Sequence, residues 1–243
     1  MTTYVLVPGF WLGAWAWDAV AEDLRSRGHA VTAVELGHAP GDTAESHVDD
    51  VLGAIGPAGE PVVLVGHSGA GPVCVAAAER ARDRIARLVL VDTGPLPDGV
   101  AQIDFTPPEV QEWTRAEIEA HGSGQPMPTR AEFDALGTST AGLPDDVFAD
   151  VRARSLVEPA GAVLTGVRRG TPDPTLPKTV VACSFTLGQV RPMIDAGVPG
   201  FAEMGGPEWS FVELPTGHWP MFSEPERLAE VLDGDRDPVT RPW

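Results

Sequence analysis

Residues 62–71 read Val-Val-Leu-Val-Gly-His-Ser-Gly-Ala-Gly, and this stretch decides the fold of the chain. The apolar run predicts a buried strand, and the alanine-rich residues 73–82 predict a helix directly after it. A strand, a sharp turn and a helix in this order raise the hydroxyl of Ser68 above the edge of a sheet. The turn strains the backbone at the serine, so small residues such as Gly66 and Gly69 must flank it. The stretch therefore predicts a nucleophilic serine.

Apolar strand signals recur along the rest of the chain, and most of them are separated by helical patterns. They are too continuously apolar for half-exposed strands, which indicates a sheet covered on both faces. We therefore expect an α/β fold with a mostly parallel sheet and helices on both faces. The predicted strands are Tyr4–Val7, Ala30–Leu36, Pro61–Gly66, Ile85–Asp92, Thr179–Cys183 and Ser210–Leu214.

One connection, between Asp92 and Thr179, is about 85 residues long, far more than a simple crossover needs. It contains helical patterns at Pro108–His121, Thr129–Leu136 and Asp145–Leu156. No repeat or low-complexity run indicates a second independent unit. We expect one domain over residues 1–243, with a helical cap at approximately 95–177 inserted over the carboxyl ends of the strands, where open α/β sheets bind ligands.

The composition limits the partners of the chain. Its 243 residues can bury a full core, and a formal net charge of −18 argues against nucleic acid and anionic membranes as partners. No apolar run approaches the roughly 20 residues of a membrane span, and the first residues lack the features of a signal peptide, so we expect a cytoplasmic protein. Cys74 and Cys183 are interpreted as core residues, and no metal or other cofactor is expected. A small-molecule substrate is expected, and the oligomeric state is left open.

A serine hydroxyl needs a nearby base, and the best candidate among the six histidines is His218. It follows the last predicted strand, so its loop lies at the same edge of the sheet as Ser68. His67 is adjacent to the serine and is expected to support the turn. The remaining histidines, at positions 29, 38, 47 and 121, lie in polar or turn-like sequence and are expected to face solvent.

The stretch Leu6-Val7-Pro8-Gly9-Phe10-Trp11-Leu12-Gly13-Ala14-Trp15-Ala16-Trp17 and the stretch Gly217-His218-Trp219-Pro220-Met221 resemble two regions of one known group. This is the plant methylesterase and hydroxynitrile lyase branch of the α/β-hydrolase superfamily, and the resemblance covers essentially the whole chain. It implies an α/β-hydrolase fold. It also implies that the backbone N–H groups of Phe10 and Gly69 form an oxyanion hole.

The third member of the catalytic triad departs from this resemblance. Relatives carry an aspartate just past the strand before the last one, and here residues 181–187 contain no carboxylate. Asp92, at the end of the strand after the serine strand, is the preferred replacement, and Asp195 is the second candidate. Asp92 could instead cap a turn, since Thr-Gly-Pro follows it, and a triad without a carboxylate would still act more slowly.

The resemblance leaves several reactions to compare. Lyases of this branch have a threonine and a lysine where this chain has Gly9 and Trp219, so nothing would hold a departing cyanide. Hydrolysis of an ester or thioester of a small apolar molecule through an acyl-enzyme is therefore preferred, with Trp11 and Trp219 lining the substrate pocket. The alternatives are a hydroxynitrile-lyase-like C–C lyase and a ligand-binding or weakly catalytic protein of the same fold, comparable to the hormone receptors that use it.

Overall fold

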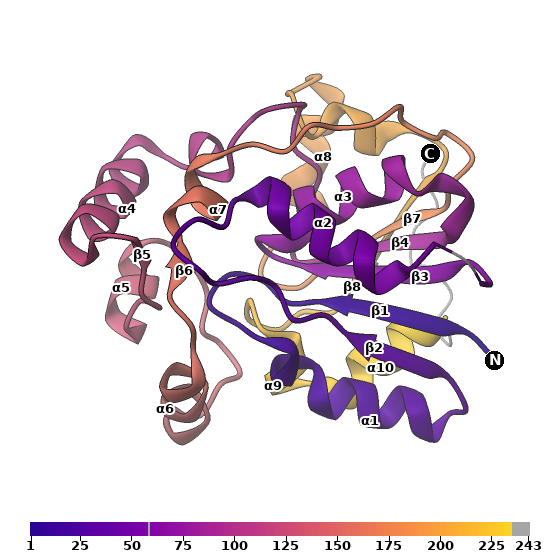
Figure 1. The fold of residues 1–243 in the computed structure, drawn as a ribbon, viewed down its shortest axis with the longest axis horizontal. Coiled ribbons are helices and arrows are strands. Elements are labelled where there is room, and N and C mark those ends of the chain that lie inside the picture. The colour runs from indigo at the N-terminus through magenta and orange to yellow at the C-terminus, as the bar shows by residue number, and fades with distance from the viewer. Residues whose placement is uncertain (58, 235–243) are drawn as a thin grey trace.

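The computed structural model describes residues 1–57 and 59–234. Its main sheet has six strands in the order β2-β1-β3-β4-β7-β8, and every neighbouring pair is parallel. The α/β fold with helices on both faces is therefore confirmed (Figure 1). The strands are β1 (Thr3–Val7), β2 (Ala30–Ala33), β3 (Val62–His67), β4 (Ile85–Val91), β7 (Lys178–Ala182) and β8 (Trp209–Glu213).

Two hydrophobic clusters cover the two faces of the sheet, because successive strand residues point to opposite sides. In β3, Val62 and Leu64 join the first cluster, while Val63 and Val65 join the second. The first cluster packs beneath α2 (Ala44–Ile55), α3 (Ala70–Arg80) and α8 (Leu187–Asp195), and the second beneath α1 (Asp18–Ser26) and α10 (Pro225–Asp233). The short helices η1 (Ala14–Trp17), η4 (Ala202–Gly205) and α9 (Pro220–Ser223) add buried side chains to these clusters, and η2 (Arg82–Arg84), which buries none, joins α3 to β4.

The long connection between β4 and β7 lies beside the carboxyl ends of the strands, at the left of Figure 1. It contains η3 (Gln102–Phe105), α4 (Pro108–His121), α5 (Arg130–Ala135), α6 (Asp145–Arg154) and α7 (Ala160–Leu164). The helix α4 has the bounds that the sequence predicts, with a proline at its first position and the left-handed Gly122 after its last. The sequence analysis missed α7 and a two-stranded antiparallel ribbon of β5 (Gly124–Gln125) and β6 (Glu158–Pro159).

None of the described helices is long and apolar enough to cross a membrane. Nor does the described part of the chain contain a group of three or more histidine, cysteine, aspartate or glutamate side chains placed to hold a metal ion.

Candidate active site

Ser68 lies in the sharp turn between β3 and α3, with a φ of 48° that a non-glycine residue rarely adopts. The turn requires small residues because neighbouring side chains leave no space for a Cβ atom. A Cβ at Gly66 would lie 2.6 Å from Sγ of Cys74, and a Cβ at Gly69 would lie 2.5 Å from the ring of Phe10. The strained turn therefore depends on these two glycines.

His218 joins Ser68 to Asp92 through two short hydrogen bonds. Its Nε2 lies 2.7 Å from the Ser68 hydroxyl, and its Nδ1 lies 2.6 Å from Oδ2 of Asp92. The carboxylate only accepts, so Nδ1 carries the proton and Nε2 is left to accept from the serine. The three side chains come from residues up to 150 positions apart in sequence. This arrangement can move a proton from the serine hydroxyl to the imidazole.

Asp92 follows the end of β4 and is buried, with a φ of 51°. Its Oδ1 accepts from the backbone N–H groups of Cys183 and Ser184, at 2.9 and 2.8 Å, and its Oδ2 also accepts from the Ser184 hydroxyl at 2.5 Å. Burial by itself would raise the pKa of Asp92, but the hydrogen bonds from His218 and Ser184 outweigh burial and lower it. The carboxylate is thus kept ionised beside the imidazole.

Asp195, the second candidate for the acid, lies elsewhere. It ends α8, its side chain is 61% exposed, and it pairs with Arg191 one helical turn earlier. Of the two candidate aspartates, the structure therefore brings only Asp92 to His218.

His67, which the sequence analysis expects to support the serine turn, bonds instead to the loop of His218. Its Nε2 donates to the carbonyl oxygen of His218 at 2.7 Å, which requires a proton on that nitrogen. Burial, together with the nearby His218 ring, lowers the pKa of His67 to about 3, so the ring is neutral at physiological pH. The cap holds the same loop from the other side, since the N–H of His218 donates to the carbonyl oxygen of Ser139 at 2.9 Å.

Phe10 and Gly69 are neighbours beside Ser68, as the close approach of a Cβ at Gly69 to the phenyl ring shows. Within the described part of the chain, neither backbone N–H donates a hydrogen bond. Two free N–H groups beside a serine hydroxyl can donate hydrogen bonds to a substrate oxygen on which negative charge develops.

Trp11 has a φ of 65°, and with Ser68 and Asp92 it completes the set of non-glycine residues with positive φ in the described chain. The cap binds it at three points. Its N–H donates to Oε2 of Glu158 at 2.8 Å, its carbonyl oxygen accepts from the N–H of Leu156 at 2.8 Å, and its indole donates to the carbonyl oxygen of Gln125 at 3.1 Å. We refer to these three bonds as the Trp11 clamp. Sequence reasoning missed Glu158 because no motif marks it.

Glu158 is 1% exposed, and its Oε1 has no hydrogen-bond partner within the described residues. Burial raises the pKa of Glu158 to about 7, and the bond from the Trp11 N–H opposes this only in part. The carboxyl therefore titrates near neutral pH.

Trp219, the other tryptophan predicted to line the pocket, is buried with 2% exposure. Its ring lies 4.9 Å from that of Phe133 and 5.0 Å from that of His218. It packs the cap against the histidine loop. That Trp219 also lines the substrate pocket stays a prediction.

Two of the histidines expected to face solvent do not. His47 is buried, with its Nε2 2.8 Å from the carbonyl oxygen of Gly37, and both ring nitrogens of His38 are buried. The expectation failed because α2 packs His47 toward the sheet, on the same face as Val48 and Val51.

Cys74 and Cys183 are buried and unpaired, and burial raises the pKa of both thiols, so neither favours the reactive thiolate.

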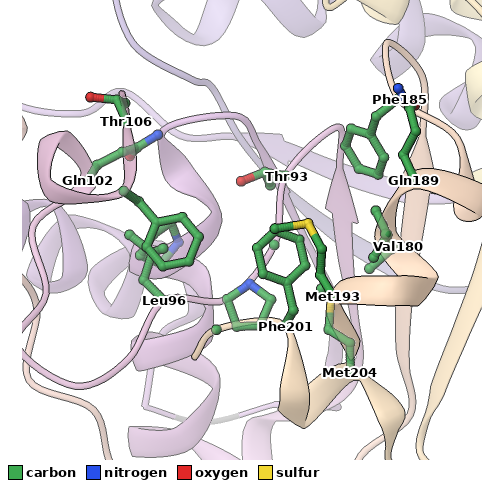
Figure 2. A pocket seen from close by; sticks show the side chains of 16 residues that line it. Thr93, Leu96, Gln102, Thr106, Val180, Phe185, Gln189, Met193, Phe201 and Met204 are labelled. Atoms are coloured by element: carbon green, nitrogen blue, oxygen red, sulfur yellow. The ribbon is translucent and has the colours of Figure 1, made fainter. Parts of the chain in front are cut away.

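An apolar cavity of about 420 Å³ lies near the site, next to the loop that follows Asp92 (Figure 2). Its wall contains neither Ser68 nor either predicted pocket tryptophan. A much smaller cleft contains Phe10 and Gly69 and shares Pro72 and Gln102 with the larger cavity. The two spaces are thus neighbours across these shared side chains.

Comparison with known proteins places this geometry in context. The family model described as "Alpha/beta hydrolase family" matches residues 4–231. A carbendazim hydrolyzing esterase from Nocardioides sp. (strain SG-4G) is 31% identical over 261 residues, which cover 96% of this chain and 98% of that protein. Methylesterase 2 of Arabidopsis thaliana is 32% identical over 137 residues, covering 49% of this chain and 52% of its own.

Among solved structures, an extracellular alpha/beta-hydrolase from a Paenibacillus species has a similar fold. Its TM-score is 0.80 at 24% sequence identity, covering 98% of this chain and 100% of that one. That hydrolase shares structural and functional homology with tobacco salicylic acid binding protein 2. The family model and methylesterase 2 confirm the resemblance to the plant methylesterase branch, and the Paenibacillus structure shows the same fold.

Proposed function

The chain belongs to the alpha/beta hydrolase family, and from that premise we propose that it is a serine esterase that acts through Ser68, His218 and Asp92. The observation that carries the proposal is the unbroken hydrogen-bonded chain from the Ser68 hydroxyl to the Asp92 carboxylate. Named esterases among the relatives support the same reaction.

The mechanism follows from the positions of the three side chains. The Ser68 hydroxyl attacks the ester carbonyl while His218 takes its proton, and the ionised Asp92 stabilises the imidazolium that forms. The N–H groups of Phe10 and Gly69 donate hydrogen bonds that stabilise the charge developing on the carbonyl oxygen, an effect of roughly 3–4 kcal/mol per donor. His218 then returns the proton to the leaving alcohol, and water, activated by the same imidazole, releases the acyl group.

The substrate is proposed to be an ester or thioester of a small, uncharged, apolar molecule. Apolar aromatic side chains surround the site, and the relatives include a carbendazim hydrolyzing esterase and methylesterases. The cytoplasmic location stays a prediction, and the Paenibacillus structural relative is described as extracellular.

The two alternative functions find less support. A cyanide-releasing lyase of this branch would place a lysine after the catalytic histidine, and the buried Trp219 stands there. A binding protein without turnover would not need a serine hydroxyl aligned on a carboxylate-supported imidazole.

Labelling with a fluorophosphonate probe tests the proposal directly. The wild type should be labelled at Ser68 and should hydrolyse 4-nitrophenyl butyrate, and Ser68→Ala should lose both properties. Ser26→Ala, at the end of α1, serves as the control and should keep both. An unlabelled wild type that still binds apolar ligands would overturn the esterase proposal in favour of a binding protein.

A further inference from the structure

The 420 Å³ cavity has the size of a small-molecule site, for which the range is roughly 300–1,000 Å³. It lies between the loop after β4, the helix η3 and the pair α8 and η4 (Figure 2). Leu96, Val180 and Met204 form buried apolar parts of its wall. The three side chains of the Ser68 triad are not part of this wall.

Apolar side chains at the cavity face water. Phe105 is 39% exposed and Met193 is 37% exposed, and they are two of the four exposed large hydrophobic residues in the described chain. The ring of Phe105 lies 5.8 Å from that of Phe201, which also lines the cavity. A ligand that covered these side chains would remove apolar surface from water, which is favourable by about 25 cal/mol per Å².

The wall also limits the charge of a ligand. None of the sixteen residues that line the cavity is charged, so an ionic group would lose its hydration without a partner. Thr93 and Gln102 line the cavity, and their side chains can form hydrogen bonds with one polar group of a ligand.

We propose that this cavity binds a neutral, largely aromatic or aliphatic small molecule with one hydrogen-bonding group, at a position separate from Ser68. The proposal does not depend on the esterase activity, because it rests on the shape and chemistry of the wall alone.

Fluorescence titration with N-phenyl-1-naphthylamine, a neutral aromatic amine, tests this site. The dye should bind saturably, whereas 8-anilinonaphthalene-1-sulfonate, the same skeleton with a negative charge, should bind at least tenfold more weakly. Labelling Ser68 with a fluorophosphonate should leave binding of the amine unchanged.

Two variants locate the bound dye. Gly94→Leu should fill the cavity, because a Cβ at Gly94 would lie 3.6 Å from Sδ of Met204 without a clash, and should weaken binding at least tenfold. Gly41→Leu, in open surroundings, should bind as the wild type does. Met193→Glu changes only the exposed part of the wall and should also weaken binding, which keeps the test decisive if Gly94→Leu fails to fold. Unchanged affinity in the folded cavity variants, or loss of binding after Ser68 labelling, would overturn the proposal.

The Trp11 clamp carries a second inference, which rests on the proposed function. Trp11 directly follows Phe10, whose N–H is proposed to stabilise the oxyanion, and its φ of 65° is one that a bulky residue rarely adopts. A strained residue keeps its conformation only when its surroundings hold it, and here Glu158 and Leu156 of the cap hold the N–H and the carbonyl of Trp11.

Glu158 is an unusual residue for this place. It is buried without a cationic partner, and one of its oxygens has no hydrogen bond within the described chain. Burying an apolar side chain here would cost less free energy than burying this carboxyl. What the carboxyl provides, and an apolar side chain could not, is the hydrogen bond to the Trp11 N–H. We infer that Glu158 is a positioning residue, which fixes the loop carrying the Phe10 N–H against the cap.

Steady-state kinetics and hydrogen exchange together test Glu158. Glu158→Leu should lower kcat for 4-nitrophenyl butyrate by roughly 10- to 100-fold with KM within twofold, because oxyanion donors act on the transition state. Glu158→Gln keeps an acceptor for the Trp11 N–H and should lose less than Glu158→Leu. Glu132→Gln, in the partly buried capping box of α5, is the matched control and should change neither constant.

Mass-spectrometric exchange of a peptide spanning residues 9–13 reads the loop independently of activity. Its protection should fall in Glu158→Leu and not in Glu132→Gln. Unchanged protection, or lost protection with unchanged kcat, would overturn the positioning role. The wild type could also prove inactive while the loop still loses protection in Glu158→Leu. That result would refute the esterase proposal, and the Trp11 clamp would then have no role in catalysis.

Discussion

The Ser68 side of the site and the Trp11 side are held by different parts of the molecule. Ser68 and Asp92 follow adjacent parallel strands and His218 follows β8, so the central sheet places all three, and the cap adds one bond, from the N–H of His218 to the carbonyl oxygen of Ser139. Trp11 is held by the ribbon and neighbouring residues of the cap, through Glu158, Leu156 and Gln125. The first set of bonds belongs to the core, and the second joins the core to an insertion.

The two sides also differ in how their carboxyl groups are satisfied. Asp92 accepts from two backbone N–H groups, a hydroxyl and an imidazole, and its pKa is lowered. Glu158 accepts one backbone N–H, and its pKa is raised to about 7 by burial. We therefore expect the carboxyl of Asp92 to stay ionised throughout the neutral range and the carboxyl of Glu158 to titrate within it.

Asp92→Asn should give the largest effect on the sheet side. An amide would disturb the tautomer of His218 and would not stabilise the imidazolium, so kcat should fall by about 10³- to 10⁴-fold. Asp195→Asn should leave kcat within twofold, because that side chain pairs with Arg191 in solvent. Esterase assays of both variants measure this, and a loss smaller than tenfold in Asp92→Asn would remove Asp92 from the triad.

The sheet side could be predicted from the sequence because its signals are local. A continuous apolar strand, a Gly-x-Ser-x-Ala turn and a helix fix the place of Ser68, and parallel strands bring the loop of His218 to the same edge. The sequence could only rank Asp92 ahead of Asp195 as the acid of the triad. The choice depends on whether backbone groups just past β7 can donate hydrogen bonds to the Asp92 carboxylate. The structure supplies them from Cys183 and Ser184, backbone groups that no sequence pattern marks.

The cap side could be predicted only as helices. Hydrophobic periodicity and Pro108 indicated α4, but β5 and β6 contain two residues each, which is too short for any periodic signal. The role of Glu158 therefore depends on a tertiary contact with Trp11, 147 residues away, and was not predictable. For the same reason the sequence did not predict the large cavity, since residues that line it lie as far apart in the chain as Pro72 and Met204.

Glu158→Gln should change how stability depends on pH. The pKa of Glu158 is raised from 4.5 to about 7 in the folded state, so the folded protein binds more protons than the unfolded chain between these values. The contribution of this group to stability is present at low pH and is lost as pH rises through about 7, by about 3 kcal/mol in total.

The glutamine variant lacks this loss. Its free energy of unfolding in urea, relative to the wild type, should therefore increase between pH 5 and pH 8 by about 2–3 kcal/mol. Taking the difference between the two proteins cancels the other titrating groups, which include His38. A difference that stays constant with pH would show that the carboxyl is not buried in the folded protein, and the contrast between the two sides would be lost.

Ser184→Ala should give the smallest effect, and it tests whether the sheet side is held redundantly. The variant loses the hydroxyl that donates to Oδ2 of Asp92 but keeps the backbone N–H groups of Ser184 and Cys183 on Oδ1. Because Ser184 is exposed, water can replace the hydroxyl, so kcat should fall only about three- to tenfold with KM unchanged. Loss of this donor should also raise the pKa of Asp92 and move the acid limb of the plot of kcat against pH to higher pH. Ser26→Ala should change neither. A 100-fold loss would show that the hydroxyl, rather than the backbone N–H groups of Cys183 and Ser184, positions the carboxylate. The Asp92 side would then depend on one side chain, as the Trp11 side depends on Glu158.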